Sequence, residues 1–170
     1  TRREKLEKSD WDGMVLAKAG VTRLGWTEMI SEVFEPDYML PAVGQGALAV
    51  EIRHNDQELL SMLMPLNHLP TQQATSGERA LLRRLEGGCQ IPIGTYGRIV
   101  SGTFLLDAIV GNLDGSTIVR GSMKGSPGES ESLGIQLAGE LVSKGAGKIL
   151  EEIRKTVKGT AHVGSSGINV

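Results

Sequence analysis

The sequence has little that would support disulfide bonding, base stacking or membrane insertion. Its 170 residues include a single cysteine, so no disulfide can form within the chain, and we expect a reducing compartment, the cytoplasm. Aromatic residues make up only 4% of the sequence, which argues against a broad platform for stacking bases or sugars. No run approaches the roughly 20 apolar residues of a membrane span. The formal net charge of −2 gives no basic excess, so neither a membrane nor a nucleic acid is expected as a partner.

The first 70 residues carry pieces of a mixed α/β pattern with too few strands to close a core. The chain opens on the charged TRREKLEKSD, without Met and without the apolar run of a secretory leader, so we expect it to be part of a longer protein. Apolar runs predict a buried strand or core segment over 14–19 and a strand over 47–52. Leucines at helical spacing predict a helix over about 56–66.

The rest of the sequence has the pattern of a small domain of helices and strands. A helix is expected to begin at an N-cap on Thr71 and to end at Gly87 and Gly88, because glycine readily adopts the left-handed conformation of a helix C-terminus. One face of this helix collects small and apolar residues: Ala74, Gly77, Leu81 and Leu85.

Three strands and two helices are expected to follow this helix. The strands are predicted over 93–100, 103–110 and 116–124, and the short Gly-containing turns between them favour antiparallel hairpins. Apolar spacing predicts helices over about 133–142 and 146–157. This order of elements predicts a three-stranded antiparallel sheet covered on one face by helices.

The single cysteine, Cys89, follows two glycines in the turn between the long helix and the first strand. A lone cysteine is most often a small buried residue, but a Gly-Gly-Cys turn favours an exposed thiol. The partial negative charge of the preceding helix C-terminus disfavours a thiolate, and Arg83 and Arg84 are near enough in sequence to offset it. These charges leave the reactivity of the thiol open.

Cysteine hydrolase and metal chemistry have weak support. A thiol hydrolase needs a base beside the sulfur, and His54, His68 and His162 show no local signature that ties any of them to Cys89. One cysteine and three scattered histidines do not have the spacing of a metal site, so no metal is expected.

Two further features allow a structural or a functional interpretation. The "GQG" at 44–46 precedes a predicted strand, so it is not a dinucleotide-binding fingerprint, and it is either a tight turn or a loop whose backbone approaches a ligand. Arg2, Arg3 and Arg23 are either solvated surface charges or bidentate partners for carboxylates, and Arg23 is the best candidate because it closely follows an apolar run.

Several of these stretches together resemble one enzyme family. "LPAVGQGALAVEIR" at 40–53, "LNH" at 66–68 and "ERALLRRLEGGCQIPIG" at 78–94 closely resemble porphobilinogen deaminases, also called hydroxymethylbilane synthases. The opening "TRREKLEKSDWDGMVLAKAGVTRLG" is also similar to that family, and the resemblance runs in the family's order to about residue 157.

The resemblance implies a transferase of porphyrin (heme) biosynthesis. Such an enzyme condenses four porphobilinogen molecules head to tail, with loss of ammonia, into hydroxymethylbilane. Its dipyrromethane cofactor is joined by a thioether to the cysteine that corresponds to Cys89, which would be an anchor and not a turnover nucleophile. The resemblance also implies that Arg2 and Arg23 bind the carboxylates of the pyrroles and that Gly20 and Gln45 line the same cleft.

The family has three domains, and the resemblance covers only part of them. It implies that residues 1–42 belong to a second, periplasmic-binding-protein-like domain with a mixed sheet. Residues 43–65 would return to the first domain, and 66–170 would form the C-terminal domain that anchors the cofactor. The family's catalytic aspartate belongs to the first domain, so no catalytic residue is expected in this chain and the chain alone is expected to be inactive. The partner implied is the N-terminal part of the same enzyme, which is expected to be a monomer when whole. The alternative is a non-catalytic module that uses the C-terminal domain for binding.

Overall fold

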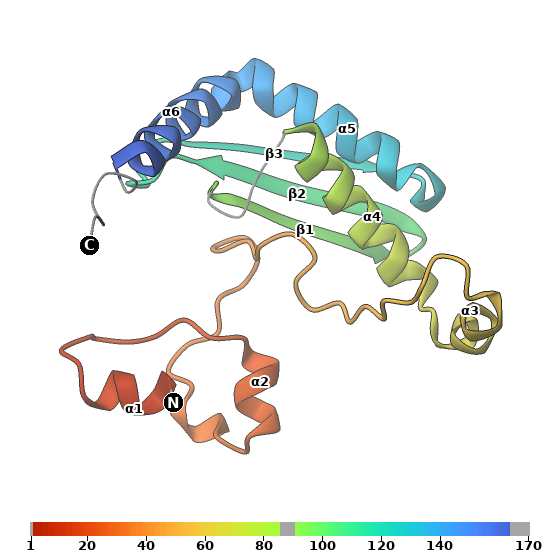
Figure 1. Cartoon of the computed structure of the whole chain (residues 1–170), viewed down its shortest axis with the longest axis horizontal. Coiled ribbons are helices and arrows are strands. Elements are labelled where there is room, and N and C mark those ends of the chain that lie inside the picture. Colours follow the sequence, from red (N-terminus) through yellow and green to blue (C-terminus); the bar gives the residue numbers. More distant parts are fainter. Residues whose placement is uncertain (1, 86–90, 164–170) are drawn as a thin grey trace, which may run out of the picture. The chain divides into compact units, whose positions relative to one another are not determined.

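The computed structural model describes residues 2–85 and 91–163, so Cys89 and the glycines before it lie outside the described residues. The chain divides into two compact units, Thr1–Glu35 and Pro36–Val170. The larger unit contains the three strands and the helices that pack on them (Figure 1).

The first unit has helices α1 (Arg2–Glu7), α2 (Lys18–Arg23) and the short 3-10 turn η1 (Thr27–Met29). The guanidinium of Arg3 lies 5.4 Å from the centre of the Trp26 ring, and this cation–π contact joins α1 to the chain after α2. The strand or core segment predicted over 14–19 is wrong: these residues form no strand, and Val15 is 64% exposed. No described residue of this unit is buried, so the apolar run has no core to enter.

The helix predicted over 56–66 is confirmed as α3 (Gln57–Leu63) followed by the turn η2 (Met64–Leu66). The Asp56 carboxylate caps α3 by accepting the Leu59 N–H at 3.1 Å.

The strand predicted over 47–52 is absent, and Leu48 in this segment is fully exposed. A strand needs a neighbouring strand to satisfy its backbone groups, and the described residues offer none to this segment.

The long helix α4 (Leu69–Arg84) begins three residues before the predicted start. His68 is the N-cap in place of Thr71, and Pro70 lies in the first turn, where a missing N–H is harmless. The predicted apolar face is confirmed, since Ala74, Gly77 and Leu81 are buried and Leu85, the C-cap, is 2% exposed.

The three predicted strands form one antiparallel sheet in the order β1-β2-β3. They are β1 (Ile93–Val100), β2 (Thr103–Gly111) and β3 (Ile118–Gly125). The β1–β2 turn places Ser101 and Gly102 at φ values of 49° and 75°, which gives the turn the twist that a two-residue hairpin requires. The inward residues of β2 are all at most 1% exposed: Phe104, Leu106, Ala108 and Val110.

Helices α4, α5 (Ser130–Leu141) and α6 (Gly147–Val163) cover one face of the sheet (Figure 1), which confirms the predicted layer arrangement. The 3-10 turn η3 (Pro127–Glu129) precedes α5, and the π-helical segment η4 (Val142–Ala146) precedes α6. Gly145 in η4 has φ +112°, a conformation that separates the two helices.

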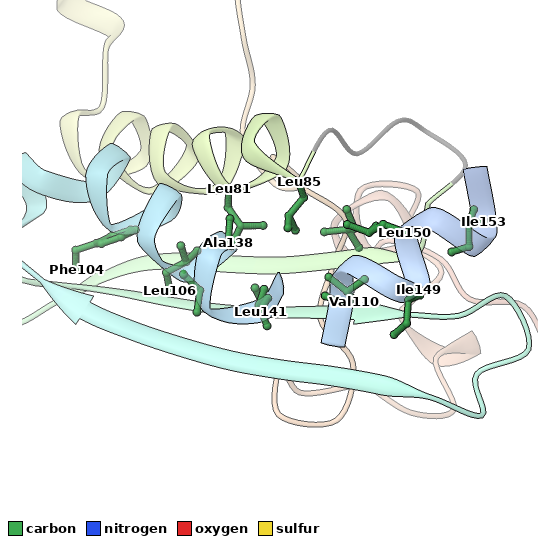
Figure 2. Close-up of a cluster of buried hydrophobic side chains, with 14 residues drawn as sticks. Leu81, Leu85, Phe104, Leu106, Val110, Ala138, Leu141, Ile149, Leu150 and Ile153 are labelled. Atoms are coloured by element: carbon green, nitrogen blue, oxygen red, sulfur yellow. The ribbon is translucent and has the colours of Figure 1, made fainter. Parts of the chain in front are cut away.

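The core lies between these helices and the sheet (Figure 2), and it is formed mainly by leucine and isoleucine side chains of α4, α5 and α6 packed on β2. Within the described residues, no helix combines the length and the apolar character that crossing a bilayer requires.

Candidate functional site

The described residues on both sides of the Cys89 segment belong to the core. Leu85 ends α4 and is 2% exposed, and Ile93 begins β1 and is 8% exposed. The carbonyl oxygen of Leu85 also accepts a hydrogen bond from Arg154 Nη2 on α6 at 2.9 Å. The candidate anchor therefore lies on a short segment between two fixed points of the same packed core.

The "GQG" stretch is a tight turn, as one of the two interpretations predicted. Gly44 and Gly46 have φ values of 75° and 81°, which are favourable only for glycine, and the Gln45 N–H bonds to the Ala42 carbonyl at 3.2 Å. The Gln45 side chain is exposed between the two glycines. A Cβ at Gly44 or Gly46 would meet no atom within 4 Å, so backbone conformation and not crowding explains these glycines.

Glu78 of α4 holds this turn against the sheet. One oxygen of its carboxylate accepts the Gly44 N–H and the other accepts the Gly97 N–H of β1, each at 2.7 Å. Pro41, at the start of the turn, accepts the Thr95 N–H at 2.8 Å. β1 is an edge strand, and these two acceptors satisfy N–H groups that no neighbouring strand of the described sheet reaches.

Among the described residues, Glu78 is the one charged residue that is buried, with 5% of the residue exposed. Burial raises its pKa above the usual 4.5, because a carboxylate loses hydration when it leaves water. The N–H groups of Gly97 and Gly44 oppose this rise of the pKa by hydrogen bonding to the charged form.

The predicted ligand residues of the first unit lie on its two helices. Gly20 and Arg23 are three residues apart on α2, and Arg2 is the first residue of α1. All three are exposed, and among the described residues neither guanidinium has a hydrogen bond or an ion pair. A Cβ at Gly20 would meet nothing within 4 Å. Two unpaired guanidinium groups remain available to bind carboxylates.

The histidines of the described chain offer no evident base. His54 and His68 are exposed, and His68 Nδ1 is engaged with Thr71 Oγ1 at 2.8 Å, while the side chain of His162 lies outside the described part. No group of three or more His, Cys, Asp or Glu in the described ranges is arranged to hold a metal ion.

Comparison with known proteins identifies the family of this chain. Residues 1–61 match the family model described as "Porphobilinogen deaminase, dipyromethane cofactor binding domain", and residues 73–143 match "Porphobilinogen deaminase, C-terminal domain". The chain belongs to the porphobilinogen deaminase family. The second match contains Cys89.

Curated members of the family are close relatives of this chain. The porphobilinogen deaminase of Carboxydothermus hydrogenoformans is 50% identical over 155 residues, which are 91% of this chain and 50% of the relative. That of Chlorobaculum tepidum is 49% identical over 159 residues, which are 92% of this chain and 51% of the relative. This chain thus spans about half the length of the curated porphobilinogen deaminases that it matches.

Glu78 and Arg154 were not among the residues singled out from the sequence. Glu78 had a usable signal: it lies four residues after Ala74 and seven before Leu85, so helical periodicity places a charge on the predicted buried face. Arg154 had no such signal in the sequence, because Leu85, whose carbonyl it contacts, lies 69 positions earlier in the chain.

Proposed function

We propose that this chain is the cofactor-bearing part of an enzyme that condenses four porphobilinogen molecules head to tail into hydroxymethylbilane, with loss of one ammonia at each addition. Cys89 holds the dipyrromethane through a thioether. The observation that carries this proposal is that Cys89 is the only thiol of the chain and lies within the match to the family's C-terminal domain. A new thioether needs a thiol, and the other sulfur-containing side chains of the chain are methionines, which have none.

The residues of the cofactor-binding match fit an anionic oligopyrrole. Arg2 and Arg23 are exposed cations without a partner among the described residues, and their planar groups suit the acetate and propionate carboxylates of the pyrrole rings. Gln45 offers an exposed amide on a turn that Glu78 fixes, and Gly20 leaves open space on α2. The bound dipyrromethane supplies the free pyrrole end to which further units are added, and these residues bind and orient its carboxylates.

The domain organisation supports a partner of the same enzyme. Residues 1–42 are part of the second, periplasmic-binding-protein-like domain, 43–65 return to the first domain, and 66–170 form the C-terminal domain. Large apolar side chains exposed along 43–65 support a protein interface there: Leu48, Val50, Met62 and Met64 are at least 56% exposed. The assembled enzyme is a cytoplasmic monomer, and the catalytic aspartate comes from the first domain.

A chimera tests the activity. The half of the Carboxydothermus relative that this chain does not match is placed before residues 1–170, and the release of hydroxymethylbilane from porphobilinogen is measured. We expect turnover by the chimera and none by this chain alone, with the full relative as the positive control. A folded chimera that is inactive beside an active control, or turnover by the chain alone, would contradict the proposal.

A further inference from the structure

Glu78 is a buried carboxylate to which the proposed chemistry assigns no role. Its two oxygens accept the N–H groups of Gly44 and Gly97, each at 2.7 Å. A carboxylate is costly to bury, and hydrogen bonds to the charged form offset only part of that cost. An apolar side chain would fill the same position at lower cost, so the carboxylate is explained by the two N–H groups that it holds in place.

The close packing of α4 on β1 brings this carboxylate within reach of both N–H groups. A Cβ at Gly97 would lie 2.8 Å from the carbonyl oxygen of Ala74 and 3.2 Å from Cγ of Glu78. Because Gly97 has no side chain, α4 approaches the edge strand closely at this point. The side chain of Glu78 therefore connects the helix, the edge of the sheet and the turn that contains Gly44.

That turn is held through its backbone, while the side chain that it presents is open to solvent. The Pro41 carbonyl accepts the Thr95 N–H of β1 at 2.8 Å, and Glu78 holds the Gly44 N–H. The next residue, Gln45, has an exposed side chain. The Gln45 amide thus projects from a backbone whose position is already fixed on both α4 and β1.

We propose that Glu78 is a positioning residue for Gln45: it holds the backbone of the turn so that the Gln45 amide can bind a pyrrole carboxylate without the turn first having to be ordered. Glu78 acts through the turn and does not touch the substrate. A turn that is already in its binding conformation loses less conformational freedom when a ligand binds, which strengthens binding. This inference rests on the proposed function, in which Gln45 is one of the residues that bind the carboxylates of the pyrroles.

A double-mutant cycle in the chimera tests whether Glu78 acts through Gln45. Glu78→Gln keeps the size of the side chain, but its amide nitrogen cannot accept one of the two N–H groups. We expect Glu78→Gln and Gln45→Ala each to raise KM for porphobilinogen about fivefold, as loss of one typical hydrogen bond predicts, and the double variant to raise it no further. A residue that only stabilised the fold would lower the amount of active enzyme, and with it the apparent kcat, and would leave KM unchanged.

Amide hydrogen exchange of this chain measures the position of the turn without any turnover. We expect Glu78→Gln to speed exchange at Gly44 and Gly97 about tenfold, as loss of a hydrogen bond to a charged group predicts, and to leave exchange in β2 unchanged. Glu151→Ala, which removes an exposed carboxylate from α6, is the control and is expected to change neither exchange nor KM. If circular dichroism shows that Glu78→Gln is unfolded, Glu78→Asp replaces it, because its shorter side chain cannot reach both N–H groups.

Three results would overturn the inference while the unsubstituted chimera remains active. They are an unchanged KM for the Glu78 variant, effects of the two single substitutions that multiply in the double variant, and unchanged exchange at Gly44. An unsubstituted chimera that forms no hydroxymethylbilane would instead contradict the proposed function, and the inference with it.

Discussion

The carboxylate of Glu78 and the backbone N–H of Gly44 are hydrogen-bonded at 2.7 Å, although 34 residues separate them in the sequence. The second oxygen of the same carboxylate takes the Gly97 N–H at the edge of the sheet. One buried side chain thus connects α4, β1 and the turn that presents Gln45. This contact fixes the turn that carries Gln45, a proposed site residue, although no strand lies beside that turn in the described sheet.

Replacing Glu78 by alanine is expected to lower the free energy of unfolding by about 2 to 4 kcal/mol, because two N–H groups lose a buried acceptor. Urea unfolding followed by circular dichroism measures the change. Glu151→Ala, which removes an exposed carboxylate from α6, is the control and is expected to stay within about 0.5 kcal/mol of the wild type. Similar values for the two variants would show that the Glu78 contacts do not hold the turn.

The stability contributed by Glu78 is expected to decrease as the pH rises. Burial raises the pKa of Glu78 in the folded chain above the usual 4.5, so the folded state holds the proton over a pH range in which the unfolded state has lost it. The stabilisation from the protonated form is complete below 4.5 and is lost as the pH rises through the folded value. The amide of the Glu78→Gln variant does not ionise in this pH range, so this variant is the reference against which the effect of Glu78 is measured.

Urea unfolding of the wild type and Glu78→Gln over a series of pH values measures this effect. The difference in free energy of unfolding, wild type minus variant, should fall as the pH rises above 4.5 and then level off. A difference that rises through this range would mean that the hydrogen bonds to the charged form outweigh burial.

Helices α4 and α5 cross at two glycines, and alanine at Gly134 should be destabilising. A Cβ at Gly134 would overlap the carbonyl oxygen of Gly77, a backbone atom that cannot move aside. We expect Gly134→Ala to lower the free energy of unfolding by about 1 to 3 kcal/mol. Gly139→Ala on the same helix is the matched control, because its Cβ would meet nothing within 4 Å, and a gain of about 0.5 to 1 kcal/mol is expected from helix propensity. Thermal unfolding that ranks the two variants in the opposite order would contradict the close crossing.

Arg23 should affect binding of porphobilinogen units more than an equivalent charge elsewhere on α2. In the chimera, Arg23→Met is expected to raise KM for porphobilinogen about tenfold or more, since a charged hydrogen-bonding partner is worth about 1.5 to 3 kcal/mol. Lys18→Met removes the same charge from the first residue of α2 and is the control. If the two substitutions change KM equally, Arg23 contributes only through the overall surface charge and does not bind the substrate directly.

Periodicity predicted the elements whose contacts are local or follow a repeating pattern. The alternation in 103–110 gave β2 within one residue, because one face of that strand enters the core at every second position. The small and apolar face of α4 was also predicted, since the same spacing places those residues against β1 and α5.

Most of the errors and omissions involve contacts that one segment cannot specify, and the start of α4 is a local exception. The 47–52 run has the composition of a strand, but the described chain contains no strand to pair with it. Thr71 has the chemistry of an N-cap, yet His68 and Pro70 start α4 earlier. Glu78 and Arg154 act on atoms 19 to 69 residues away, so only the folded arrangement identifies their partners.

The most direct test of the central claim is the mass of the Cys89 peptide. The chimera and its Cys89→Ser variant are produced in cells that make porphobilinogen, digested and compared by mass spectrometry. We predict that the Cys89 peptide of the chimera carries one dipyrromethane. The corresponding peptide of the Cys89→Ser variant should be unmodified, and that variant should form no hydroxymethylbilane. Full activity of the Cys89→Ser chimera, or an active chimera whose Cys89 peptide carries no adduct, would contradict the account.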